Sequence, residues 1–109
     1  MFPDWMKDAP KPYSSVLVAN RGEIAVRILQ SARELGLKGI SIYSDSDENS
    51  LHVEISEEAV YLPGELLSET YLNIDAIINA AKISGAEAIH PGYGFLSERS
   101  DFAKAVVDA

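Results

Sequence analysis

The stretch 16–28, Val-Leu-Val-Ala-Asn-Arg-Gly-Glu-Ile-Ala-Val-Arg-Ile, changes its hydrophobic period halfway, and this change limits the fold more than any other feature. The three apolar residues that open it are typical of a strand buried on both faces. Apolar residues then recur at helical spacing, at positions 24, 28, 32 and 35. Only Asn20, Arg21 and Gly22 separate the two patterns. A strand therefore turns directly into a helix, whose N-terminus lies at the carboxyl edge of a sheet, where open α/β folds bind ligands.

Segments of strand and helix character alternate along the rest of the chain. Gly36 and Gly85 follow the two clearest helical patterns and suit the left-handed conformation that ends helices. We expect Ser68 or Thr70 to cap the start of the second of these helices. The alternation predicts an α/β fold, a doubly wound, Rossmann-like parallel sheet of about four strands with flanking helices. The predicted elements are strand 16–18, helix 23–35, strand 38–43, strand 58–62, helix 72–83, strand 86–90 and helix 96–107.

The composition limits the classes of function and partner. The chain has 109 residues, a formal charge of −8 and no apolar run long enough for a membrane span, so we expect one small domain with neither a nucleic-acid partner nor a membrane partner. The absence of cysteine excludes disulfides, thiol catalysis and zinc-thiolate sites, and it fits a reducing compartment. The first fourteen residues resemble neither a signal peptide nor a transit helix. We therefore expect a cytoplasmic protein, or one of the mitochondrial matrix if a transit peptide has been removed.

The chain divides into two parts. Residues 1–14, with three prolines and mixed charge, are predicted to form a flexible N-terminal arm. The alternative is that Phe2, Trp5 and Met6 anchor a partner surface. Residues 15–109 form the domain, which ends in a helical pattern without a stop signal. We therefore expect a domain truncated at its C-terminus, the beginning of a longer protein.

The turn at 20–22 lies where phosphate groups bind in many α/β folds, but its residues argue against that use. A dinucleotide-binding turn has three glycines, whereas this turn has only Gly22, and Glu23 adds a negative charge in the first turn of the helix. Glu23 instead complements the helix dipole and can pair with Arg27, which contributes roughly 0.3–0.5 kcal/mol when exposed. We therefore expect a structural turn and no phosphate cradle.

The polar loop 44–50 and the two histidines give weak signals. Asp45 follows the second strand, where a ribose-binding acid would lie, and this leaves a stand-alone nucleotide-binding or dinucleotide-binding module as an alternative function. An Asp-x-Asp-x-Asn pattern in the same loop copies the start of a calcium-binding loop, but serines occupy the positions that need glycine and glutamate. His52 and His90 fall in different elements. We expect a solvated turn, no metal site and no catalytic residue.

The loop 90–95, His-Pro-Gly-Tyr-Gly-Phe, is the strongest candidate for a ligand contact. Two glycines let the backbone approach a ligand, while Tyr93 offers a flat aromatic face and a hydroxyl group. A tight turn with a packed tyrosine is the alternative. With the strand order 3-2-1-4, the switch point of the sheet lies between the first and fourth strands. We therefore expect residues 20–23 and 91–95 to face each other across one crevice.

Three motifs together resemble the N-terminal domain of biotin carboxylase. The resemblance covers residues 15 to about 107, and three motifs in the right order are far more specific than any one loop. Related chains are the biotin-carboxylating parts of acetyl-CoA, propionyl-CoA, methylcrotonyl-CoA, pyruvate and urea carboxylases. The motifs are Val-Ala-Asn-Arg-Gly-Glu-Ile-Ala at 18–25 with Arg-Ile at 27–28, Tyr-Leu-Asn at 71–73, and Ile-His-Pro-Gly-Tyr-Gly-Phe-Leu-Ser-Glu at 89–98.

The resemblance implies a half-reaction that this chain does not complete alone. ATP, with Mg2+, activates bicarbonate as carboxyphosphate, and the CO2 released is taken up by biotin on a biotin carboxyl carrier domain. In the family, the ATP-grasp domains that follow this pre-ATP-grasp domain in the same chain supply the phosphate-binding and metal-binding groups, and nothing in these 109 residues matches them. We therefore expect no catalytic residue, no ATP site and no metal site here, no tightly bound cofactor, and an inactive fragment.

The resemblance also assigns roles to single residues. Tyr93 and Gly94 match the positions beside the biotin bicycle, and Glu98 matches an acidic residue of the same loop near the active site. Arg27 matches a helix residue at the two-fold interface of the bacterial homodimer. Gln30 departs from the arginine found there in the best-known bacterial form, which weakens the case for that dimer. An interaction domain that only dimerises through the Arg27 face is a further alternative.

Overall fold

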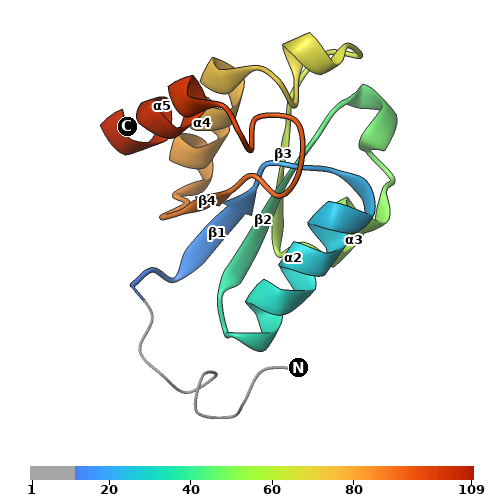
Figure 1. Ribbon diagram of the computed structural model, residues 1–109. Helices are drawn as coiled ribbons and strands as arrows, with labels where there is room; N and C mark the ends of the chain where they lie inside the picture. Colours follow the sequence, from blue (N-terminus) through green and yellow to red (C-terminus); the bar gives the residue numbers. More distant parts are fainter. Residues whose placement is uncertain (1–11) are drawn as a thin grey trace.

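The computed structural model describes residues 12–109 (Figure 1). The predicted flexible arm therefore lies almost entirely outside the described residues, as do its three candidate anchors Phe2, Trp5 and Met6. Within residues 12–109, no helix has the length and apolar character needed to cross a membrane.

Four parallel strands form the sheet in the order β3-β2-β1-β4, so the predicted fold class and strand order are confirmed. The strands are β1 (Ser15–Val18), β2 (Lys38–Tyr43), β3 (Glu58–Tyr61) and β4 (Ile89–His90). The fourth strand is shorter than predicted, because only Ile89 and His90 pair with β1. The short β4 leaves the loop that follows it close to the end of β1.

Helices cover both faces of this sheet (Figure 1). In the view of Figure 1, α2 (Gly22–Glu34) and α3 (Leu51–Ile55) lie together, and α4 (Ile74–Ser84) and α5 (Ser100–Asp108) lie together on the other side of the strands. Two short 3-10 turns, η1 (Asp45–Asp47) and η2 (Leu67–Glu69), belong to the connections. The last helix begins at Ser100 and not at 96, because residues 91–99 form an extended loop and turns.

The side chains of β1 alternate between the two layers of helices. Val18 packs with Ala25 and Leu29 of α2, whereas Leu17 belongs to the larger cluster that contains Ile77 of α4 and Phe102 of α5. These side chains are buried, and each of the larger ones stabilises the fold by about 1.5–3 kcal/mol. The continuous apolar run read from the sequence is therefore the centre of a two-sided core.

The start of α4 corrects the predicted cap. Asn73, and neither Ser68 nor Thr70, precedes the helix, and its side chain accepts a hydrogen bond from the backbone N–H of Ala76 at 3.0 Å. Thr70 instead donates its hydroxyl to the carbonyl of Leu66. The helix therefore begins at Ile74, after the 3-10 turn that contains Ser68. Gly85, with a φ of 72°, ends it in the left-handed conformation, as predicted.

Candidate functional site

Asn20 joins the end of β1 to the loop that follows β4. Its side-chain N–H2 group donates to the carbonyls of Pro91 at 2.9 Å and Tyr93 at 2.7 Å, and its Oδ1 accepts from the backbone N–H of Arg21 at 2.8 Å. The strand β1 directs this side chain inward, and it is 1% exposed. The turn and the loop were predicted to face each other across a crevice, but the Asn20 bonds bring them into direct contact.

The loop itself has an unusual backbone. Gly92 and Gly94 have φ angles of 69° and 67°, and Phe95, which has a side chain, has a φ of 47°. A side chain in this region is strained, which marks the segment as one held by its surroundings. The ring of Phe95 stacks on Tyr71, with 5.6 Å between the ring centroids. The loop is therefore fixed at one end by Asn20 and at the other by Tyr71.

The two glycines serve different purposes. A Cβ atom at Gly92 would lie 2.8 Å from Ile24 Cγ2 and 2.9 Å from Asn20 Nδ2, so the absence of a side chain lets the loop approach α2 and β1. A Cβ atom at Gly94 would meet nothing within 4 Å. Gly94 therefore presents bare backbone to open space.

Tyr93 lies between these glycines and is 79% exposed, the most exposed aromatic side chain among the described large hydrophobic residues. Glu98, the other residue predicted to face biotin, is also exposed and lies in the turns before α5. A backbone hydrogen bond from Ser97 to the carbonyl of Gly94, at 2.9 Å, links the loop to these turns. Tyr93, Gly94 and Glu98 are thus all exposed in the connection between β4 and α5, and the described hydrogen bonds include none between the side chains of Tyr93 and Glu98.

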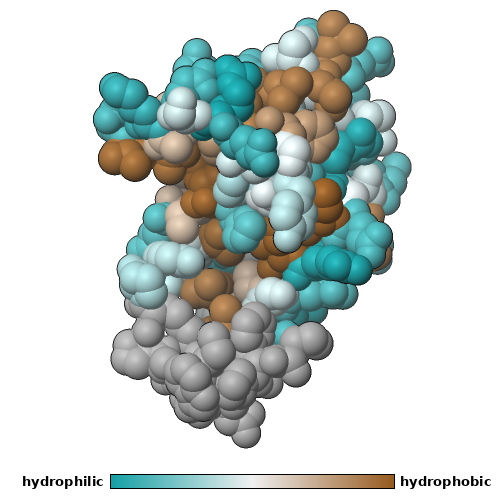
Figure 2. All heavy atoms as spheres, viewed as in Figure 1, coloured by the Kyte–Doolittle hydropathy of each residue, from teal (hydrophilic) through white to brown (hydrophobic). Residues whose placement is uncertain are grey.

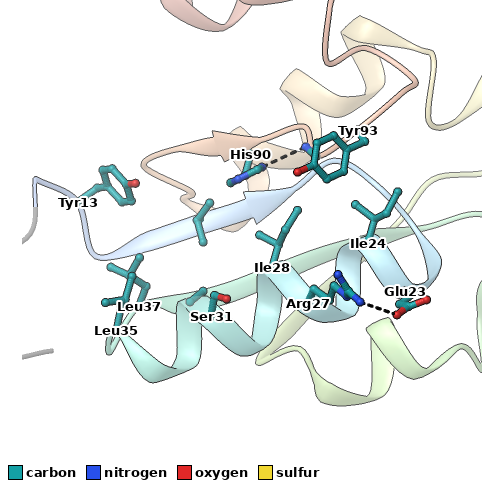
Figure 3. A pocket seen from close by; sticks show the side chains of 13 residues that line it. Tyr13, Glu23, Ile24, Arg27, Ile28, Ser31, Leu35, Leu37, His90 and Tyr93 are labelled. Carbon is teal, nitrogen blue, oxygen red and sulfur yellow. Dashed lines mark hydrogen bonds and ion pairs between the residues drawn. The ribbon is translucent and has the colours of Figure 1, made fainter. Parts of the chain in front are cut away.

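A groove of about 710 Å³ runs along α2 and reaches Tyr93 (Figure 3). We call it the α2 groove. Arg27, predicted to lie at a subunit interface, is exposed on its wall and pairs with Glu23 at 3.2 Å, as the spacing predicts. Figure 2 shows hydrophobic residues at the surface across the middle of this face. The residues that line the α2 groove include Ile24, Arg27, Ile28, Leu35, Leu37 and Tyr93.

The apolar stripe predicted at positions 24, 28, 32 and 35 coincides only in part with the buried face of α2, since Ala32 alone of the four is buried. Ile24 and Ile28 are only half-buried, because they line the groove, and the buried positions of α2 are Ala25, Leu29 and Ala32. Small residues and one leucine thus face the sheet, and the isoleucines lie beside Tyr93 (Figure 3). Arg27 and Tyr93, which were predicted to belong to separate sites, both line the α2 groove.

A polar network centred on the buried Asp47 lies beside the loop. Asp47, 4% exposed, accepts hydrogen bonds from Arg21 at 2.5 Å and from the Tyr71 hydroxyl at 2.6 Å. The guanidinium of Arg21 also lies over the Tyr71 ring, 5.6 Å from its centroid. The polar loop was predicted to be a solvated turn, which is wrong for Asp47. The network therefore connects Arg21, after β1, and Asp47, after β2, to Tyr71. Phe95 of the loop stacks on the ring of Tyr71.

The protonation states of this network follow from its contacts. Burial raises the pKa of the Asp47 carboxyl, but the hydrogen bonds from Arg21 and Tyr71 outweigh burial and leave that pKa below its ordinary value. Burial and the bond to Asp47 raise the pKa of the Tyr71 hydroxyl. Asp47 is therefore an anion and Tyr71 a neutral donor at neutral pH, so the network is a fixed support.

Among the remaining candidate positions, Asp45 and His52 each have at least one hydrogen-bond partner. Asp45, considered as a ribose-binding acid, accepts a hydrogen bond from the Tyr61 hydroxyl. Among the described residues no group of three or more histidine, aspartate or glutamate side chains could hold a metal ion. His52 is buried, and its Nε2 lies 3.1 Å from the carbonyl of Ile42.

Two positions that matter to the loop were not recognised in the sequence as residues that hold it. Asn20 was read only as part of a turn, although a polar residue at the carboxyl end of a buried strand is a signal for a ligand or loop contact. Tyr71 was read only as part of a motif, and its burial at 0% exposure places a hydroxyl where it needs a partner.

Comparison with known proteins identifies the family of the chain. The family model described as "Biotin carboxylase, N-terminal domain" matches residues 12–109. The chain is 48% identical over 96 residues to the mitochondrial propionyl-CoA carboxylase alpha chain of Rattus norvegicus, which is 88% of this chain and 13% of that protein. The chain thus spans only a small part of the length of such relatives.

Two solved structures contain the same fold. The urea carboxylase of Kluyveromyces lactis has a TM-score of 0.89 and 52% identity, over 91% of this chain and 9% of that one. The biotin carboxylase of Campylobacter jejuni, in a complex with β,γ-ATP, has a TM-score of 0.85 and 45% identity, over 88% of this chain and 22% of that one. The chain belongs to the family of biotin carboxylase N-terminal domains.

Proposed function

We propose that this chain is the biotin-facing N-terminal domain of a biotin-dependent carboxylase, and that Tyr93, Gly94 and Glu98 form part of the wall beside biotin. The observation that carries the proposal is the exposure of Tyr93 on a loop whose backbone is otherwise held firmly. A flat ring kept in solvent by a strained backbone loses apolar burial, which is explained if a ligand covers it.

The residues at this loop fit a bicyclic, largely apolar ligand. The ring of Tyr93 can lie against one face of biotin, and the open space at Gly94 lets the ligand approach the main chain. Biotin supplies a ureido nitrogen that accepts the carboxyl group. This chain's share is to bind and orient the bicycle through the exposed ring of Tyr93 and the open backbone at Gly94.

The complete carboxylase requires parts outside this chain. We propose that ATP-grasp domains of the same protein bind ATP and Mg2+ and activate bicarbonate, and that a biotin carboxyl carrier domain delivers biotin to the Tyr93 loop. The small share of each relative that this chain covers supports such a division of labour. We further propose that the exposed Arg27 of α2 lies at an interface between two copies of the protein.

Substitution of Tyr93 in the complete carboxylase tests the assignment. Tyr93→Ala should raise the KM for free biotin about tenfold, the size expected when a stacked aromatic ring is lost, while the KM for ATP is unchanged. Tyr93→Phe should keep most of the affinity, because the ring face remains. Both Michaelis constants are measured by steady-state kinetics with free biotin as the acceptor.

The control is Tyr61→Ala, because Tyr61 is an exposed tyrosine of β3, at the other edge of the sheet. It should leave both Michaelis constants unchanged. If Tyr93→Ala leaves the KM for free biotin at the wild-type value, the assignment of this loop to biotin is wrong.

A further inference from the structure

We infer that Asn20 is the residue that positions the biotin-facing loop, and that it acts through the carbonyl groups of Pro91 and Tyr93. The inference rests on the proposed function of Tyr93 and adds a positioning residue to it. Asn20 lies at the end of β1, in the centre of the sheet, whereas the loop follows the edge strand β4.

The orientation of the Asn20 amide follows from its partners. The carbonyls of Pro91 and Tyr93 can only accept hydrogen bonds, so the N–H2 group must point toward them. The backbone N–H of Arg21 can only donate, so Oδ1 must point toward it. All three bonds are 2.9 Å or shorter, and the side chain is 1% exposed. Asn20 is therefore locked and cannot turn away from the loop.

The geometry of the loop shows what these bonds determine. The two carbonyls flank Gly92, whose missing side chain leaves room for the Asn20 amide and for Ile24. The Asn20 amide thus sets both the distance between the loop and the end of β1 and the orientation of the backbone on either side of Tyr93. The left-handed backbone at Gly92 and Gly94 does not hold itself, because glycine populates many other conformations.

Other contacts of the loop leave this task to Asn20. Phe95 is anchored on Tyr71, and Gly92 donates its N–H to Nδ1 of His90, two residues before it. Among the described contacts of residues 91–94, the Asn20 bonds are the side-chain hydrogen bonds that cross from another strand. Without them the segment on both sides of Tyr93 can move while Phe95 stays packed.

The test uses the complete carboxylase that contains this domain, with Asn20→Ala as the first variant. The KM for free biotin should rise about tenfold, which is the loss expected from one or two neutral hydrogen bonds, and the KM for ATP should stay at the wild-type value. Asn20→Asp should raise the KM for biotin at least as much, because it keeps the size and the acceptor but turns a carboxylate oxygen toward two carbonyls.

Asn73→Ala is the matched control. Asn73→Ala removes two side-chain hydrogen bonds, one from the N–H of Ala76 and one to the carbonyl of Glu69, whereas Asn20→Ala removes three. Neither partner of Asn73 belongs to residues 91–95. It should lower the melting temperature without changing the KM for biotin. A purely structural role for Asn20 predicts that both Asn20→Ala and Asn73→Ala lower the stability and leave the KM for biotin unchanged. That result would overturn the inference.

A second variant covers the case in which Asn20→Ala does not fold. Gly92→Ala keeps Asn20 but places a methyl group 2.9 Å from its Nδ2 and 2.8 Å from Ile24 Cγ2, so the loop must shift relative to Asn20 and α2. It should raise the KM for biotin to the same extent as Asn20→Ala is expected to do. A wild-type KM in a folded Gly92→Ala enzyme contradicts the inference.

The tests separate this inference from the proposal on which it rests. If Tyr93→Ala leaves the KM for biotin unchanged, the function proposed for the loop fails, and the role of Asn20 fails with it. If Tyr93→Ala raises the KM for biotin and Asn20→Ala does not, the loop faces biotin and the positioning role alone is wrong.

Discussion

His52 is buried at 1% exposure, and one of its ring nitrogens has no hydrogen-bond partner among the described residues. The Nε2 atom lies 3.1 Å from the carbonyl of Ile42, so the neutral ring donates there and Nδ1 is left unpaired. Burial lowers the pKa of His52 below its ordinary value of 6.5, and this effect outweighs the bond to Ile42 and the attraction of Asp47. A proton on this ring is therefore unfavourable in the folded protein.

The stability of the chain should fall as the pH falls from 7 to 5. Below the unfolded pKa of 6.5 the unfolded chain protonates His52 while the folded chain does not, so the free energy of unfolding falls, by at most about 1.4 kcal/mol per pH unit. His52→Gln removes the titrating group and keeps a donor for Ile42. Urea unfolding at several pH values should show a flatter dependence for the variant, and equal slopes would contradict the prediction.

At the scale of an element, the loop 91–95 depends on two glycines that differ in their surroundings. Gly92 and Gly94 both have a positive φ, which costs an alanine about 1–2 kcal/mol. Only Gly92 would also place its new methyl group against other atoms, those of Ile24 and Asn20. The two positions therefore separate backbone strain from close packing.

Gly92→Ala should destabilise the chain more than Gly94→Ala. We expect a loss of about 1–2 kcal/mol for Gly94→Ala from the backbone alone, and about 1–3 kcal/mol more for Gly92→Ala from the clash. Chemical unfolding of both variants measures the difference, and Gly85→Ala, with a left-handed φ and no atom within 4 Å, is the control for strain without a clash. Equal losses for Gly92→Ala and Gly94→Ala would mean that Ile24 and Asn20 move aside freely.

The sequence predicted the elements better than their connections. The change of period at 16–28 predicted β1 and α2, because a two-sided core requires an apolar strand and a striped helix. Asp47 was misread as solvated, because its partners lie 26 residues before it and 24 residues after it. The sequence of the loop could not predict its contacts with Asn20. The partners of Asn20 in the loop are main-chain carbonyls, which every residue type has.

At the scale of the whole molecule, α2 presents a face that another chain could contact. Its outer face carries the exposed pair of Glu23 and Arg27, and the half-buried isoleucines of the α2 groove lie beside this pair. Gln30 adds no charge to the same helix. An interface here would combine apolar contact with one cation, so its strength should depend only moderately on Arg27.

Arg27→Ala should weaken self-association of the complete protein by up to about tenfold, in line with the modest energy of exposed ion pairs. Sedimentation equilibrium of the wild type and the variant measures the dissociation constant. Arg33→Ala, which removes an exposed arginine elsewhere on α2, should leave it unchanged. A wild-type protein that stays monomeric at all concentrations would rule out an Arg27 interface.

The distance along the chain between Asn20 and its loop partners has a consequence for protein engineering. The two bonds span 71 and 73 residues, so the surroundings of Tyr93 are encoded in two places. A loop graft that moves residues 90–98 alone into another scaffold transfers the aromatic ring without the amide that holds it. A chimera that exchanges this loop between carboxylases needs the end of β1 from the same parent.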